Sequence, residues 1–455
     1  MSSSLSADRS VRASYEADSS GLHLIPDLVA RPESIADVID IVREADSRKI
    51  SITCAGAQTS TTGASITGSG ILMSLRSMDH IGEVDAKARR ISVGPGALVG
   101  DVKRAAAAEG LLFAPDPTSE EESTVGGAIA CNASGARTFK YGATRCHVTA
   151  LKVVTASGEL LEFARSDLEK NTAGYAFAHD PIDWFIGSEG TLGIVVEAEL
   201  RLITLPSHVV GLSVLFGEEK DALEFVVATR ESTQVRARCI EYFDKQALDI
   251  ARSTDAGAML PASAASMVYV EEEIDDDLDA CLGRWAELIE QIAPDFEPIV
   301  FDGETRLRDA RRLRHSIPAT MNERGGAFRS AGGRKVGTDW AVPYRKLAGA
   351  IAIARAIAAE RGVDQPVIYG HAGNGHPHEN FLARDADQLR LTEEVVEATL
   401  KHVLTLGGTV AAEHGIGKIK RRWLPLQMNP LQMSMMKAVK RELDPLGLLA
   451  PGNIL

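Results

Sequence analysis

Residues 124–145 read TVGGAIACNASGARTFKYGATR, a stretch rich in glycine and alanine. Such a stretch cannot build a bulky core by itself, because its small side chains bury little apolar surface. Glycine does let the backbone come close to a bound molecule. We therefore interpret the stretch as backbone packed against a large flat ligand. An Ala/Gly-rich connector is the alternative.

A second loop of small residues lies nearer the N-terminus. A strand-like alternation at residues 50–54 leads into AGAQTSTTGAS at residues 55–65. Small residues and hydroxyls that follow a strand are suited to wrapping a phosphate with backbone N–H groups. The loop matches neither G-x-G-x-x-G nor a Walker motif, which disfavours a Rossmann or P-loop fold. A loop without a ligand stays the alternative.

Two glycine-rich segments in the C-terminal third carry histidines. Residues 367–381 read VIYGHAGNGHPHENF, and residues 407–417 read GGTVAAEHGIG. Two imidazoles and one carboxylate suit a borderline divalent metal with open coordination positions. A histidine beside that carboxylate can then act as a base. The alternative is that these are loop residues that hold no ligand.

Length, charge and cysteine usage restrict the class of protein. A chain of 455 residues is too long for one core, so two or three domains are expected. The net charge of −14 argues against nucleic acid and anionic membrane as general partners. The five cysteines are scattered and never spaced C-x-x-C, which indicates a reducing compartment without an iron–sulfur cluster. Since no apolar run reaches about 18 residues, no transmembrane helix is expected.

Periodicity predicts several elements. Residues 34–47 form an amphipathic helix in which Ser34 and Asp37 make a capping box. Residues 386–406 form a helix that ends at two glycines. Residues 305–324 hold six arginines, which either line a solvated helix face or place one arginine inward to bind a carboxylate. A strand with Lys335 follows at 334–343, and a domain boundary is expected near residue 204.

Five motifs together carry a family resemblance. They are AGAQTSTTGAS, PDPTS with the glycine-rich stretch quoted first, IGSEGTLGI, GHAGNGHPHENF and AAEHGIG. In this order they resemble the vanillyl-alcohol-oxidase type of FAD-linked oxidoreductases, and within it the D-lactate, D-2-hydroxyglutarate and glycolate dehydrogenase group. The resemblance covers about residues 25–455.

The resemblance implies an α+β fold in three parts. A two-part FAD-binding domain spans residues 1–204. A cap domain spans 205–425, with an antiparallel sheet covered by helices and with the metal and catalytic motifs. A tail at 426–455 returns to the FAD-binding domain.

The resemblance also implies roles for single residues. The catalytic pair is His414 as base and Arg314 as the carboxylate-binding residue. Lys335 lies near, but not on, the position of a substrate-binding lysine in relatives and is a further candidate substrate contact. The metal ligands, for an ion of the zinc or manganese type, are His371, His378 and Glu413. The FAD-binding residues are Gly56, Ala57, Gln58, Thr59, Ser60, Pro115, Thr124, Gly126, Gly127, Asn132, Gly135, Tyr141, Glu189, Gly193, Ile194 and Asn453. Because the first FAD loop has no histidine, FAD is expected to be non-covalent.

The implied activity is oxidation of a D-2-hydroxy acid to the 2-oxo acid, with metal-assisted deprotonation of the hydroxyl and hydride transfer to flavin N5. D-lactate is favoured, because no second carboxylate-binding group is evident. D-2-hydroxyglutarate, glycolate, or a role as a subunit of a glycolate-oxidase-like complex are the alternatives. A flavin enzyme acting on an alkyl or aromatic alcohol, or a non-redox ether-lipid synthase, is a further class, but neither needs an arginine beside a two-histidine, one-carboxylate site.

The resemblance implies partners as well as chemistry. Electrons are expected to leave to an external acceptor: a quinone, a cytochrome, an electron-transfer flavoprotein or a partner subunit. A homodimer and a cytoplasmic location are expected, with peripheral association with a membrane as the alternative.

Overall fold

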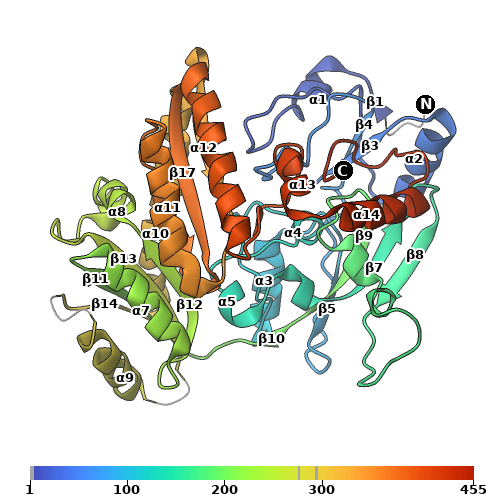
Figure 1. Ribbon diagram of the computed structural model, residues 1–455. Helices are drawn as coiled ribbons and strands as arrows, with labels where there is room; N and C mark the ends of the chain where they lie inside the picture. Colours follow the sequence, from blue (N-terminus) through green and yellow to red (C-terminus); the bar gives the residue numbers. More distant parts are fainter. Residues whose placement is uncertain (1–4, 275–276, 293–295) are drawn as a thin grey trace. The chain divides into compact units, whose positions relative to one another are not determined.

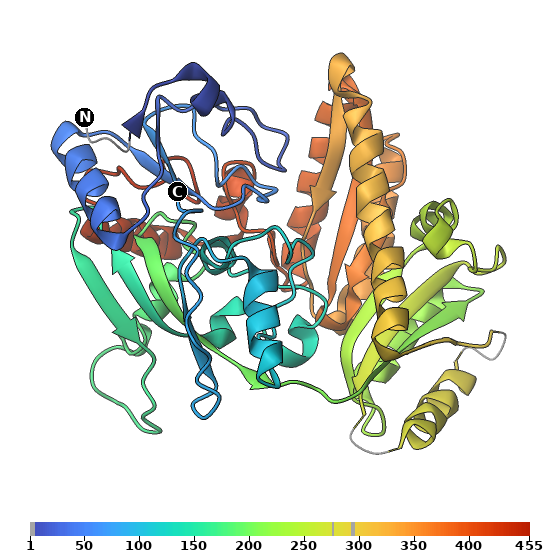
Figure 2. The ribbon, with the colours of Figure 1, turned by 180° about the vertical axis from the view of Figure 1, so that it is seen from behind.

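The computed structural model describes residues 5–274, 277–292 and 296–455. The chain forms two compact units (Figures 1 and 2). Unit 1 comprises residues 1–135, 142–205 and 413–455, and unit 2 comprises 136–141 and 206–412. The AAEHGIG segment therefore divides between the two units, with residues 411–412 in unit 2 and residues from Glu413 onward in unit 1.

Unit 1 begins with a four-stranded sheet in which β2, β3 and β4 are parallel. The strand order is β1 (Leu5–Ser6), β2 (Leu28–Ala30), β4 (Ile71–Ser74) and β3 (Ile52–Ala55). Helix α2 (Ile35–Arg48) buries Val38, Ile41 and Val42 in the core of this sheet. The predicted capping box of Ser34 and Asp37 is confirmed.

The second sheet of unit 1 is antiparallel throughout. Its order is β5 (Arg90–Val93), β9 (Ile194–Arg201), β7 (Val148–Val154) and β8 (Leu160–Ala164). Helices α3 (Val99–Ala108) and α4 (Val125–Cys131) contribute Val99, Val102 and Ile129 to the core of this sheet. The short strands β6 (Leu111–Leu112) and β10 (Ile203–Thr204) pair separately.

The C-terminal segment joins the first sheet of unit 1. Helices α13 (Leu424–Gln427) and α14 (Pro430–Leu443) precede a parallel bridge between Leu449 and Ile52. The backbone N–H of Ala450 donates to the carbonyl of Ile52 at 2.7 Å. The C-terminal segment is thus part of unit 1.

Unit 2 is built on a seven-stranded antiparallel sheet. Its order is β14 (Ile299–Asp302), β11 (Val209–Phe216), β13 (Ser266–Glu273), β12 (Ala237–Phe243), β16 (Val367–His371), β17 (His376–Asp385) and β15 (Gly332–Thr338). Helices α8 (Lys245–Arg252) and α10 (Gly303–Gly326) pack on the face that carries Phe243 and Tyr369. An antiparallel sheet covered by helices confirms the predicted α+β fold.

The remaining helices complete the two units. Helix α12 (Ala386–Thr405) ends just before Gly407, which has φ +80°, so the predicted stop is confirmed. Within the described ranges, no helix is both long and apolar enough to cross a membrane. The other helices are α1 (Arg9–Ala13), α5 (Thr138–Tyr141), α6 (Ile182–Phe185), α7 (Glu219–Glu231), α9 (Leu278–Glu290) and α11 (Leu347–Glu360).

Candidate active site

His371 and His378 lie on the hairpin formed by β16 and β17. The register pairs His371 with His376 and Tyr369 with His378, so the histidines project from the same face of the sheet. The ring centroids of His371 and His378 lie 5.1 Å apart. The turn requires Gly375, which has φ +68° and where a Cβ would meet the Val342 carbonyl oxygen at 1.9 Å. Both predicted ligands therefore come from one tight, buried turn.

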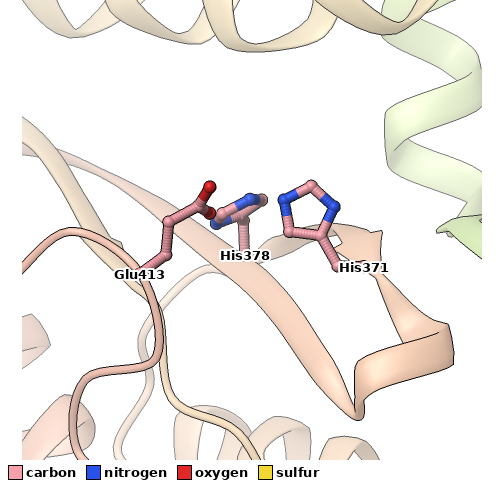
Figure 3. A group of neighbouring side chains, drawn as sticks. All are labelled: His371, His378 and Glu413. Carbon is pink, nitrogen blue, oxygen red and sulfur yellow. The ribbon is translucent and has the colours of Figure 1, made fainter. Parts of the chain in front are cut away.

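Glu413 joins these histidines from the next glycine-rich segment. The preceding Ala412 donates its N–H to the carbonyl of Asp339 at 2.8 Å, which fixes where the segment leaves unit 2. The ligand atoms of His371, His378 and Glu413 all lie within 4.8 Å of one another (Figure 3). The structure thus brings together the three side chains predicted as ligands. Their donor set of two imidazole nitrogens and one carboxylate oxygen fits a zinc- or manganese-type ion.

A buried carboxylate on β12 connects His371 to Arg314. Glu241 is 1% exposed, and its Oε1 lies 2.6 Å from Nδ1 of His371. Its Oε2 accepts a hydrogen bond of 2.7 Å from Nε of Arg314 on α10. Burial alone would raise the pKa of Glu241, but the charges and hydrogen bonds of His371 and Arg314 hold it at about 2. In the neutral imidazole, Nδ1–H of His371 can donate a hydrogen bond to this carboxylate, which leaves Nε2 to act as a ligand.

Arg314 therefore faces inward, as one of the two interpretations of the arginine-rich helix predicts. Its side chain is 11% exposed, and its Nη2 lies 3.4 Å from Nε2 of His371. Sequence reasoning missed Glu241. The available signal was an acidic residue inside the otherwise apolar strand Cys239–Phe243, because a buried carboxylate needs partners.

His414 lies in a loop that Glu189 holds. The side chain of His414 is 35% exposed, and its Nε2 lies 4.0 Å from Oε2 of Glu413. Glu189 accepts hydrogen bonds from the N–H groups of Ile416 at 2.6 Å and Gly417 at 2.8 Å. Burial raises the pKa of Glu189, while these N–H groups oppose that rise. The predicted flavin contact Glu189 thus orders the loop that presents the predicted base.

The first predicted FAD loop offers donors for an anion. Among the described residues, none accepts a hydrogen bond from the backbone N–H groups of residues 56–61. Gln58 has φ +56°, an uncommon conformation that aims successive N–H groups differently from a strand. A run of unused donors directly after β3 fits a pyrophosphate group. The assignment of Gly56, Ala57, Gln58, Thr59 and Ser60 stays a prediction.

In the second predicted FAD region, at residues 115–141, the local packing explains why threonine and glycine stand at several positions. Thr124 caps α4 by accepting a hydrogen bond from the N–H of Gly127 at 3.2 Å. A Cβ at Gly126 would meet Pro95 at 2.7 Å, and one at Gly135 would meet the Asp116 carbonyl oxygen at 2.1 Å. Pro115 directly precedes that aspartate. Flavin contact by these residues stays a prediction.

Other predicted FAD contacts are divided between the units. Asn132, with φ +50°, accepts a hydrogen bond from the Arg145 N–H at 2.9 Å in unit 1. Tyr141 lies in unit 2, where its hydroxyl donates to Glu273. Asn453 is 2% exposed and accepts a 2.7 Å hydrogen bond from Lys418. Gly193 packs tightly against Val153 and Phe185, and Ile194 opens β9 within the core.

Lys335 and Asn380 lie on the same face of the unit 2 sheet as His378. Asn380 follows His378 by two residues on β17 and pairs with Gly337 on β15, so it shares the face of His378. Its Nδ2 is buried without a hydrogen-bond partner in the described chain. Burial lowers the pKa of Lys335 to about 8, and no described residue pairs with its ammonium group. Both groups can therefore receive an anionic or carbonyl oxygen.

Two family models match this chain. One, described as the FAD binding domain, matches residues 26–164, and the other, the C-terminal domain of FAD linked oxidases, matches residues 205–454. The second match covers more than half of the sequence and includes His371, His378, Glu413 and His414.

The chain belongs to the FAD-linked oxidases of the vanillyl-alcohol-oxidase type.

Relatives of this FAD-linked oxidase include enzymes that act on small hydroxy acids. The glycolate oxidase subunit GlcD of Bacillus subtilis is 29% identical, covering 94% of this chain and 89% of its own. A D-lactate dehydrogenase of Anaerostipes hadrus is 28% identical, and a D-2-hydroxyglutarate dehydrogenase of Xanthomonas citri pv. viticola is 30% identical, with the same coverage. The chain is thus an FAD-linked dehydrogenase of this group.

A solved structure shares the fold. Alkyldihydroxyacetonephosphate synthase superposes with a TM-score of 0.73 at 17% identity, covering 99% of this chain and 82% of its own. At that identity the likeness concerns the fold alone, which agrees with the α+β architecture of the FAD-linked oxidases.

Proposed function

We propose that this FAD-linked dehydrogenase oxidises a D-2-hydroxy acid to the corresponding 2-oxo acid, with D-lactate as the favoured substrate. The observation that carries the proposal is the convergence of His371, His378 and Glu413, with their ligand atoms within 4.8 Å. A 2-hydroxy acid offers a hydroxyl and a carboxylate oxygen on adjacent carbons. Such a pair can reach a divalent ion and a neighbouring guanidinium together.

The chain supplies positioning and proton transfer for this reaction. Arg314 would bind the substrate carboxylate through its guanidinium, which Glu241 holds at 2.7 Å. His414 would take the hydroxyl proton, a step worth about 10²–10⁴-fold in rate. When bound, the divalent ion would lower the hydroxyl pKa, and non-covalent FAD would take up the two electrons.

A second candidate substrate is a 2-hydroxy acid with a second carboxylate. Lys335, which is half-buried and pairs with no described residue, and the buried amide of Asn380 lie on the face that carries His378. A half-buried cation without a partner favours binding of an anion, because its own desolvation is then offset. This pair supports the D-2-hydroxyglutarate alternative, and the name of the Xanthomonas relative agrees with it. Glycolate offers no group for Lys335.

The test is a screen of D- and L-2-hydroxy acids with an artificial electron acceptor, in the presence and absence of added zinc or manganese. D-lactate and D-2-hydroxyglutarate should reduce the dye, whereas their L-enantiomers should not. Lys335→Met should weaken D-2-hydroxyglutarate oxidation while sparing D-lactate oxidation. Dye reduction by alkyl or aromatic alcohols alone, or by no substrate at all, would contradict the proposal.

The proposed reaction needs an electron acceptor outside the chain. The reduced enzyme would pass its electrons to an external acceptor, namely a quinone, a cytochrome, an electron-transfer flavoprotein or a partner subunit. We place the enzyme in the cytoplasm and propose a homodimer. Size-exclusion chromatography with light scattering measures the oligomeric state directly.

A further inference from the structure

Residues 414–441 have a charge balance opposite to that of the whole chain. They contain no aspartate or glutamate, whereas the complete sequence has a net charge of −14. The basic residues in this segment are Lys418, Lys420, Arg421, Arg422, Lys437, Lys440 and Arg441. The segment thus concentrates positive charge on one part of an acidic protein.

The same segment exposes aliphatic side chains. Helix α14, which is part of unit 1 (Figure 1), contains no buried residue. Leu431 is 69% exposed and Met435 is 52% exposed. Together with exposed Ala438 they recur at the i, i+4 and i+7 spacing of one helix face. Leu426 on α13 and Leu446 beyond α14 are 38% and 53% exposed.

Five of the seven cations of the segment fall into an inward set and an outward set. Of the other two, Lys420 is buried and Arg422 lies over the Trp423 ring. Lys418 and Lys440 point inward: Lys418 donates to Asn453, and Lys440 donates to Asp444 and to the Thr191 carbonyl. These contacts fix the segment to unit 1.

The outward set consists of Arg421, Lys437 and Arg441. All three are exposed, and no described residue makes an ion pair with them. Lys437 and Arg441 lie beside the aliphatic stripe, and one exposed acid, Glu442, lies at its C-terminal end. We call Arg421, Leu426, Leu431, Met435, Lys437 and Arg441 the α14 face.

We propose that the α14 face docks on an anionic lipid surface. An aliphatic stripe with lysine and arginine beside it is the pattern of helices that lie in the membrane interface. Aromatic anchors, which dominate protein–protein interfaces, are missing from the α14 face, since Trp423 is only 5% exposed. The local positive charge lets this face approach anionic headgroups although the chain as a whole is acidic.

Both electrostatic attraction and burial of apolar surface should contribute to binding of the α14 face to lipid. Each outward cation contributes about fivefold to partitioning onto an anionic surface. The attraction should weaken as salt shortens the screening length. The aliphatic side chains add a component that persists at higher salt, because burial of apolar surface does not depend on charge.

The experiment is co-sedimentation of the full FAD-loaded chain with vesicles of phosphatidylcholine alone or mixed with phosphatidylglycerol. We expect binding to the mixed vesicles only. Arg421→Gln, Lys437→Gln and Arg441→Gln combined should reduce that binding on the order of a hundredfold. Leu431→Ser with Met435→Ser should reduce it more than tenfold.

A matched control is Leu168→Ser in unit 1. Leu168 is 70% exposed, close to the value for Leu431, but its neighbours include Asp167 and Glu169. This variant should bind vesicles like the wild type, and all variants should keep dye-linked activity in solution.

Two results would overturn the proposal. One is that the wild type and the variants bind the mixed vesicles equally, or that none of them binds. The α14 face would then be expected to bind an acidic protein and not a lipid surface. The other is a wild-type dimer that Leu431→Ser with Met435→Ser dissociates, because the α14 face would then be an interface between two copies of the chain.

Discussion

Glu241 lies 2.6 Å from Nδ1 of His371, and the second oxygen of the same carboxylate lies 2.7 Å from Nε of Arg314. One buried acid therefore orients both a candidate metal ligand and the candidate substrate-binding arginine. Since the two partners come from β16 and α10, the carboxylate also fixes the distance between two elements of unit 2. Glu241 is thus a positioning residue.

Glu241→Gln should weaken metal binding by about 10–100-fold, because the amide orients His371 less well than a carboxylate does. The KM for the hydroxy acid should rise in the same variant, since Arg314 loses its ion pair. Metal titration followed by steady-state kinetics measures both effects.

The control for this change is Glu379→Gln. Glu379 is fully buried in the same sheet, and burial raises its pKa to about 7. An amide oxygen can still accept the hydrogen bond from Trp340. Equal losses of metal affinity in the two variants would indicate general damage to the sheet and would exclude a specific role for Glu241.

Arg314→Lys should raise KM more than it lowers kcat. Lysine keeps the positive charge but lacks the planar fork that pairs with a carboxylate, and its shorter reach leaves Glu241 poorly partnered. Steady-state kinetics with D-lactate measure the two constants, and Arg312→Lys, on the exposed side of the same helix, is the matched control. An unchanged KM for Arg314→Lys would remove the arginine from substrate binding.

His414→Gln should slow reduction of the bound flavin by about 10²–10⁴-fold. FAD should stay bound, because the described contact of His414 with the first FAD loop is through its backbone carbonyl, which accepts a hydrogen bond from Thr62 and is kept in this variant. Anaerobic stopped-flow absorbance with substrate in excess measures the rate. Reduction at the wild-type rate would exclude His414 as the base.

The pH dependence of stability should report on Glu271 in unit 2. This carboxylate is 2% exposed and accepts hydrogen bonds from Arg137 at 3.0 Å and Arg238 at 2.7 Å. Burial alone would raise the pKa of Glu271, but these charges outweigh it and hold the pKa well below its usual range. The stabilisation is therefore present above the ordinary glutamate pKa and is lost as the pH falls toward the folded-state value.

Glu271→Gln should accordingly destabilise unit 2 at neutral pH by about 3–5 kcal/mol, since the buried Arg238 and the half-buried Arg137 lose their counter-charge. The difference from the wild type should shrink as the pH is lowered below about 4. Thermal unfolding across a pH series measures this difference. A difference that stays constant with pH would show that the charge of Glu271 contributes nothing.

Local sequence patterns predict the local structure of this chain well. Ser34 and Asp37 mark the start of α2, and the glycine pair at 407–408 marks the end of α12, because caps and stops depend on neighbouring residues. The proximity of His371 and His378 follows from a short hairpin. The donor chemistry of the two glycine-rich segments suggests a carboxylate beside these histidines, and the family resemblance assigns Glu413 to that role.

Long-range pairing explains what sequence patterns missed. Glu241 reaches His371 because β12 pairs with β16, a pairing that no local pattern encodes. The short segment 136–141 lies in unit 2 although its flanking residues belong to unit 1. Tyr141 therefore contacts Glu273, which lies far along the chain. Such contacts depend on the folded arrangement of strands and not on spacing within a motif.

The most direct test of the central claim is the metal content of the purified enzyme, measured together with dye-linked D-2-hydroxy-acid oxidation before and after treatment with a chelator. We predict that activity falls with the loss of a divalent ion, returns when zinc or manganese is added, and does not return in His378→Ala. Full activity in an enzyme shown to be free of metal would contradict a role for His371, His378 and Glu413 in holding a catalytic ion.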